Sequence, residues 1–156
     1  MLHAHALLVD VLEKDLQAST GLPLGSFEVL VQLASAPDGQ LKMVELAQSL
    51  LLSKSGVTRL VDRMEAVGLV TRGACPTDRR IVYTVLTPQG RAALRDAMPR
   101  HLESLAERFT SHLTPAEVGM LRGTLQKILD AHGYGVPACP TAEQISADEP
   151  RKATVG

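Results

Sequence analysis

The stretch SKSGVTRLVDRMEAVGLVTR, residues 53–72, decides the fold of this chain. Ser53 is a typical N-cap residue, because its hydroxyl can accept a hydrogen bond from an unpaired amide of the first helical turn. Gly68 can end the same helix in the left-handed conformation. The sequence therefore predicts a helix over residues 53–67. Its buried face is set by apolar residues at positions i, i+3, i+4 and i+7, namely Val57, Leu60, Val61 and Met64.

The opposite face of this helix carries small hydroxyl groups followed by arginines. Such side chains on the N-terminal half of a helix suit a helix that lies in a DNA major groove. A solvated face of an amphipathic helix is the simpler interpretation when the stripe is taken alone. The candidate DNA-binding residues are Ser53, Lys54, Ser55, Gly56, Thr58, Arg59 and Arg63.

Two strand-like segments follow the helix and favour the DNA-binding interpretation. Residues 69–72 and 81–86 can pair as a β-hairpin, and the loop between them forms its tip. A recognition-type helix followed by a hairpin is the order of a winged helix-turn-helix. Asp78, Arg79 and Arg80 would then lie at the tip of the wing, where an arginine can enter the minor groove and a carboxylate can hold its guanidinium.

The rest of the chain is predicted to be helical, so the fold class is mainly α with a small β-hairpin wing (α+β). Apolar residues at helical spacing predict helices near residues 8–20, 24–36 and 43–50. Thr87 and Thr114, each followed by proline, are start signals for two further helices.

These two C-terminal helices carry apolar seams that could either close a monomer core or form a dimer interface. The first seam consists of Leu94, Met98, Leu102, Leu105 and Phe109, and the second of Val118, Leu121, Leu125 and Ile128.

Composition and charge are compatible with one domain that binds a polyanion. The 156 residues are 45% hydrophobic, which suffices for a single core. The net charge of −1 conceals a segregation: residues 42–91 contain eight basic and four acidic residues, so this part carries +4 and the remainder −5. The sequence contains no run of about 18 apolar residues, the length needed to span a membrane. We expect a cytoplasmic protein.

The stretch LAQSLLLSKSGVTRLVDRMEAVGLVTR followed by DRRIVYTVLTPQGR resembles the multiple antibiotic resistance regulator (MarR) family of bacterial transcription factors. The resemblance covers roughly residues 8–129. The family's D-x-R and L-T patterns match Asp78, Arg80, Leu86 and Thr87. The resemblance implies that Arg80 is the minor-groove residue and Arg79 a phosphate contact.

The resemblance also implies a domain organisation. Residues 1–132 would form a single domain, in which residues 24–86 are the winged helix-turn-helix core. Residues 1–20 and 88–132 would supply the N- and C-terminal dimerisation helices, and residues 133–156 would be a flexible tail.

The function implied by the resemblance is transcriptional repression. A homodimer would bind double-stranded DNA at a palindromic operator, an inverted repeat, and release it when a small lipophilic or phenolic effector binds. No motif for catalysis, a cofactor or a metal is present in the sequence, and no membrane role is expected. The alternative is a winged-helix module that uses its basic face to bind an acidic protein surface.

Two sensing hypotheses stay open beside this function. Cys75, near the base of the wing, could sense oxidants if a basic neighbour lowered its pKa. His3 could chelate Cu(II) together with the terminal amine, while His101 and His112 lie on or beside the C-terminal helices. Lone histidines are more often surface residues than metal ligands.

Overall fold

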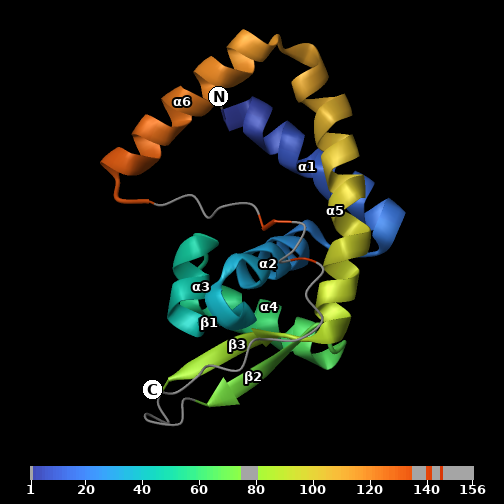
Figure 1. The fold of residues 1–156 in the computed structure, drawn as a ribbon, viewed down its shortest axis with the longest axis vertical. Helices are drawn as coiled ribbons and strands as arrows, with labels where there is room; N and C mark the ends of the chain where they lie inside the picture. Colours follow the sequence, from blue (N-terminus) through green and yellow to red (C-terminus); the bar gives the residue numbers. More distant parts are fainter. Residues whose placement is uncertain (1, 75–80, 135–139, 142–144, 146–156) are drawn as a thin grey trace.

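The structure is a computed structural model that describes residues 2–74, 81–134, 140–141 and 145. Figure 1 shows a lobe of short helices and a small sheet, from which the long helices extend. The elements are α1 (Leu2–Thr20), α2 (Leu24–Ser35), η1 (Pro37–Gly39), β1 (Gln40–Lys42), α3 (Met43–Ser49), α4 (Lys54–Ala66), β2 (Val70–Ala74), β3 (Val82–Leu86), α5 (Pro88–Arg108), η2 (Thr110–His112) and α6 (Pro115–Ala131).

The predicted helices and the hairpin are confirmed, and a third strand joins the sheet. Strands β2 and β3 pair antiparallel, with Val70 opposite Leu86. Strand β1 pairs with the other edge of β3, so the strand order is β1-β3-β2. Sequence reasoning missed β1 because three residues are too few to show an alternating pattern.

Helix α2 forms the centre of the lobe. Phe27, Leu30, Val31 and Ala34 share one face by helical spacing, and all but the partly buried Val31 are buried. Val29 and Leu33, outside that face, are buried as well. The helix contacts α1, α3, α4, α5 and the sheet, so neighbours cover it on more than one side. A prediction that assumes one buried face therefore names too few buried residues in such a central helix.

A tight junction joins the wing to α5. The Thr87 hydroxyl accepts a hydrogen bond from the Gly90 amide at 2.9 Å and can donate to the Gly68 carbonyl at 2.7 Å. A Cβ atom on Gly90 would overlap the carbonyl oxygen of Leu69, so the first turn of α5 can approach the chain this closely because residue 90 is glycine. Gly68 has a φ of +75°, as its predicted role as a left-handed cap requires.

Helices α1 and α5 lie side by side and form the scaffold that carries the lobe. The Asp15 carboxylate accepts hydrogen bonds from Ser104 Oγ at 2.7 Å and from Arg108 Nε at 3.0 Å. The bonds from Arg108 and then Ser104 lower the pKa of Asp15. Helix α5 continues through Pro99.

Helix α6 begins at the predicted start signal with a capping box, in which Thr114 and Glu117 bond to each other's backbone amides. It buries no residue within the single chain. The apolar stripe therefore does not close a monomer core, since Leu121, Leu125 and Ile128 are 37%, 41% and 49% exposed.

None of the helices in the described ranges is long and apolar enough to cross a bilayer.

Candidate DNA-binding surface

Helix α4 begins as the sequence predicts. The Ser53 hydroxyl accepts a hydrogen bond from the Gly56 amide at 3.1 Å. Gly56 also leaves room for this cap, because a Cβ atom there would lie 3.2 Å from Ser53 Oγ. The Thr58 hydroxyl donates to the Lys54 carbonyl at 2.7 Å, which leaves its oxygen lone pairs available to a ligand.

The two faces of α4 divide as the periodicity predicts. Val57, Leu60, Val61 and Met64 are buried, and the polar stripe on the other side is exposed. Arg59 and Arg63 lie one turn apart on the exposed side, and neither forms an ion pair with any described residue. The face therefore presents two guanidinium groups whose charge no described neighbour neutralises.

Arg72 behaves differently, because carboxylates of α4 neutralise it. Its Nη2 lies 2.6 Å from Asp62 Oδ1, and its Nη1 lies 2.7 Å from Glu65 Oε2. The backbone amide of Arg72 also donates to Glu65 Oε1 at 3.0 Å. The bond to Asp62 is the main reason that the pKa of Arg72 is raised. We call Arg72, Asp62 and Glu65 the wing clamp, because they join the first residues of the hairpin to α4.

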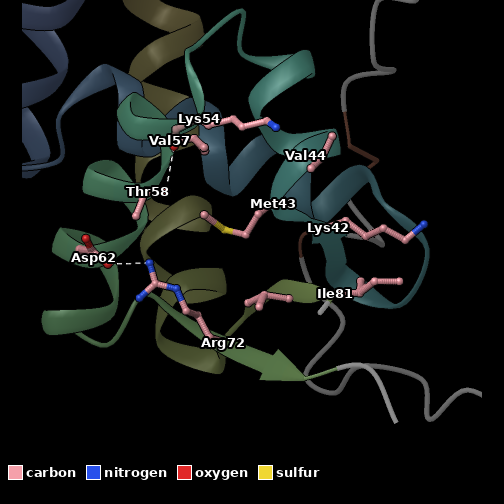
Figure 2. A pocket seen from close by; sticks show the side chains of 10 residues that line it. Lys42, Met43, Val44, Lys54, Val57, Thr58, Asp62, Arg72 and Ile81 are labelled. Carbon is pink, nitrogen blue, oxygen red and sulfur yellow. Dashed lines mark hydrogen bonds and ion pairs between the residues drawn. The ribbon is translucent and has the colours of Figure 1, made fainter. Parts of the chain in front are cut away.

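A pocket of about 600 Å³ lies between α3, α4 and the hairpin. Figure 2 shows Lys54, Thr58 and Asp62 along one wall and Lys42, Val44 and Ile81 across from them. Lys42 precedes α3 and pairs with Glu45 at 3.1 Å. The amide of Lys42 is the main cause of the lowered pKa of Glu45. Sequence reasoning did not place Lys42 beside α4, because the two come together through the fold of β1 and α3.

The predicted tip of the wing lies outside the described residues. Asp78, Arg79 and Arg80, together with the possible redox residue Cys75, all fall in the undescribed segment. Their roles stay predictions. The described strands that flank these residues are in place. The end of β2 and the start of β3 pair at Ala74 and Val82, at the end of the hairpin that lies farther from α5.

His101 is a packing residue in the described structure. Its ring lies against Phe27 with the centroids 4.7 Å apart. Its Nδ1 is buried and has no hydrogen-bond partner among the described residues. Burial lowers the pKa of His101, because the charged imidazolium loses hydration. Among the described residues no three metal-ligating side chains come together.

The lobe is thus a winged helix that presents an exposed, positively charged helix beside a hairpin, which is the arrangement of a DNA-binding protein. Comparisons with known proteins agree. The profile of the MarR family matches residues 20–81. The chain is 35% identical over 103 residues to the multiple antibiotic resistance protein MarR of Salmonella typhimurium, which covers 66% of this chain and 70% of that protein.

Two solved structures are similar in fold over most of the chain. One is Sco3205, a MarR family transcriptional regulator from Streptomyces coelicolor in complex with DNA. Its TM-score is 0.78 at 32% identity, over 89% of this chain and 90% of that chain. The other is CouR from Rhodococcus jostii RHA1 bound to p-coumaroyl-CoA, with a TM-score of 0.70 at 29% identity, over 81% of this chain and 86% of that chain.

The chain belongs to the MarR family and is a DNA-binding transcriptional regulator. The family consists of transcriptional regulators rather than enzymes. The comparisons give no support to the alternative of a protein-interaction module.

Proposed function

We propose that this regulator is a repressor that binds an inverted-repeat operator as a homodimer, with one α4 helix in each of two successive major grooves. The observation that carries the proposal is the pair of unneutralised arginines on the exposed face of α4. Arg59 and Arg63 face outward from the helix whose opposite side is fixed in the core. Arginine at such a position can donate two hydrogen bonds to guanine.

The neighbouring residues have supporting roles. Lys54 and Lys42 lie beside the pocket at the starts of α4 and α3, where they can contact phosphates on either side of the groove. Ser55 and Thr58 add hydroxyls to the same exposed face. We place the predicted wing residues Asp78, Arg79 and Arg80 at the flanking minor groove.

The dimer is proposed from the exposed apolar stripe of α6. Leu121, Leu125 and Ile128 lie along one side of a helix that has no covering partner within the described part of the chain. A second copy of α6 would remove this stripe from water. Helices α1 and α5 would complete the dimerisation scaffold.

We also propose that this DNA-binding repressor acts in the cytoplasm.

The effector is proposed to be a small phenolic or lipophilic molecule that binds between the scaffold and the lobe. Support comes from CouR, whose structure contains p-coumaroyl-CoA. Such a ligand would release the operator if it bound more tightly to a dimer whose two lobes are spaced wrongly for the DNA than to the DNA-binding form.

Fluorescence anisotropy with labelled DNA from upstream of the regulator's own gene tests this function. Wild-type protein should bind this duplex and not a scrambled one. Arg59→Ala and Arg63→Ala should each weaken specific binding by at least about ten-fold, as expected for the loss of a base contact. Arg100→Ala is the control for loss of an exposed arginine away from α4, because Arg100 lies on α5, is 60% exposed and pairs with Glu103 at 3.3 Å; the dimer mass of this variant is checked alongside. Equal losses in all three variants would oppose the proposed role of α4.

A further inference from the structure

The chain turns back toward the lobe immediately after α6. Gly133 has a φ of +66°, and its amide donates to the Asp130 carbonyl at 3.0 Å. The amide of Tyr134 donates to the Leu129 carbonyl at 2.9 Å, as in a glycine-terminated helix cap. Figure 1 shows that the described parts of the chain beyond α6 lie between that helix and the lobe, on the side of α2.

Tyr134 makes the first contact with the lobe. Its hydroxyl donates a short hydrogen bond to the Ser49 carbonyl, and the Gln48 carbonyl lies 3.4 Å from the same oxygen. Both carbonyls belong to the last turn of α3, and the Gln48 carbonyl also accepts a hydrogen bond from the Leu51 amide at 3.2 Å. A phenol from the far end of the chain therefore contributes to the C-terminal cap of α3, the helix before the recognition helix.

A second contact lies further along the same segment. The side chain of Ile145 is half-buried and packs against the main hydrophobic core. Its amide donates to the Thr141 carbonyl at 3.0 Å, and Pro140 is buried. A polar contact thus attaches Tyr134 to the lobe, and an apolar contact attaches Ile145.

In the part of the chain that the structure describes, no residue of α6 is fully buried. We propose that Tyr134 and Ile145 form an intramolecular strap, in which both side chains dock onto the lobe and the Tyr134 hydroxyl ties the end of α6 to α3. The occupants of this docking surface are these two residues of the chain itself.

The strap has a consequence for DNA binding, and this part of the inference rests on the proposed function. A dimer must hold two α4 helices at a fixed separation to bind two half-sites. A strap that limits the motion of each lobe against the scaffold prepares this arrangement before DNA arrives. Loss of one hydrogen bond or one half-buried isoleucine should lower operator affinity by between about three-fold and thirty-fold.

Hydrogen exchange measured by mass spectrometry tests the docking without DNA. The readout is the end of α3, where the amides of Leu50, Leu51 and Leu52 are hydrogen-bonded within the turn. In the full chain, Tyr134→Phe should speed their exchange by about five-fold, because it removes one hydrogen bond and keeps the ring.

Ile145→Asn should speed the same amides through loss of the apolar anchor. Tyr83→Phe is the control, since Tyr83 lies on β3 and is the other tyrosine of this chain. Unchanged exchange at the end of α3 in both strap variants would overturn the docking.

Anisotropy with the operator duplex then tests the coupling. Tyr134→Phe and Ile145→Asn should bind the operator more weakly while circular dichroism and dimer mass match the wild type. Wild-type affinity in both variants, combined with faster exchange, would overturn the coupling. Failure of the wild type to bind its operator would instead contradict the proposed function and leave the exchange result standing.

Discussion

At two single residues, backbone geometry determines which amino acid fits. Gly90 suits its position, whereas Leu51 does not. Gly90 occupies a site where no side chain fits, because its α-carbon faces the Leu69 carbonyl. Leu51 adopts a left-handed φ of +53° in the turn between α3 and α4, although a branched side chain disfavours that conformation.

We predict that Gly90→Ala is strongly destabilising. The added methyl would overlap the Leu69 carbonyl and force α5 away from the hairpin. The cost in the free energy of unfolding should be about 3 kcal/mol or more, at the upper end for overpacking. Urea denaturation measures it, with Gly25→Ala as control, because a Cβ atom on Gly25 would meet Leu60 Cδ2 at an ordinary 4.0 Å. Equal stability of the two variants would contradict the close approach.

We predict that Leu51→Asn is stabilising. The Leu51 side chain is 77% exposed, so little burial is lost, and asparagine tolerates the left-handed region better. The free energy of unfolding should rise by about 0.5 to 1 kcal/mol. Leu52→Asn, at a residue without positive φ, should bring no gain. Thermal denaturation compares the two variants. A gain only at residue 51 indicates relief of backbone strain, whereas an equal gain at residue 52 would indicate a general effect of a polar side chain.

We predict that His101 makes the protein less stable below neutral pH. Burial lowers its pKa in the folded state, so the unfolded chain binds the proton first as pH falls. Stability should therefore be constant above the ordinary histidine pKa of about 6.5 and should decline as pH falls from there toward the folded pKa. His101→Leu should flatten this part of the curve, as measured by denaturation midpoints between pH 8 and 5. An unchanged slope in the variant would assign the effect to other groups.

At the scale of elements, the structure links the recognition helix to the wing through the wing clamp. Glu65 accepts a hydrogen bond from the backbone amide and another from the side chain of Arg72, whereas Asp62 accepts one from the side chain. The direction of the hairpin relative to α4 therefore depends on Glu65 more than on Asp62.

We predict that Glu65→Gln weakens operator binding more than Asp62→Asn does. The glutamine loses charge at the residue that orients the backbone of β2, and a displaced hairpin would move the wing away from its proposed position at the minor groove. Each charge-assisted bond of this partly exposed cluster should contribute about 1 kcal/mol or less. The two variants compared by anisotropy test the order, and a larger effect of Asp62→Asn would contradict the clamp geometry.

The elements also show what the sequence could predict. The two faces of α4 followed from a 3.6-residue period, because Val57 and Met64 on the buried side alternate with Arg59 and Arg63 on the exposed side. Strand β1 could not be predicted, because its pairing with β3 depends on how α2 and α3 place three residues. The wing clamp could not be predicted either, because Asp62 and Glu65 meet Arg72 only once β2 folds back beside α4. Tyr134 and Ile145 gave no periodic signal at all.

At the scale of the whole molecule, an exposed apolar stripe and an exposed cationic helix lie on different parts of one chain. The stripe on α6 suits a second copy, and the face of α4 suits DNA. The two sites have to act together, because an inverted repeat is matched by a protein with two-fold symmetry.

We predict that Leu125→Glu dissociates the dimer. A carboxylate in the middle of the stripe would have to be buried without a partner. Size-exclusion chromatography with light scattering should show the mass of one chain for this variant and of two chains for the wild type. Lys127→Glu, on the opposite face of α6, should stay dimeric. Dissociation of both variants would point to net charge rather than to the stripe.

Operator binding with varied half-site spacing tests directly whether one dimer holds two α4 helices on an inverted repeat. The natural inverted repeat and a duplex with half a helical turn inserted between its half-sites, about five base pairs, are compared by anisotropy. Two α4 helices held by one dimer should bind the natural spacing and lose at least about a hundred-fold in affinity on the inserted duplex, since one helix then faces the wrong side of the DNA. Equal affinity for both duplexes would contradict the symmetric arrangement of recognition helices.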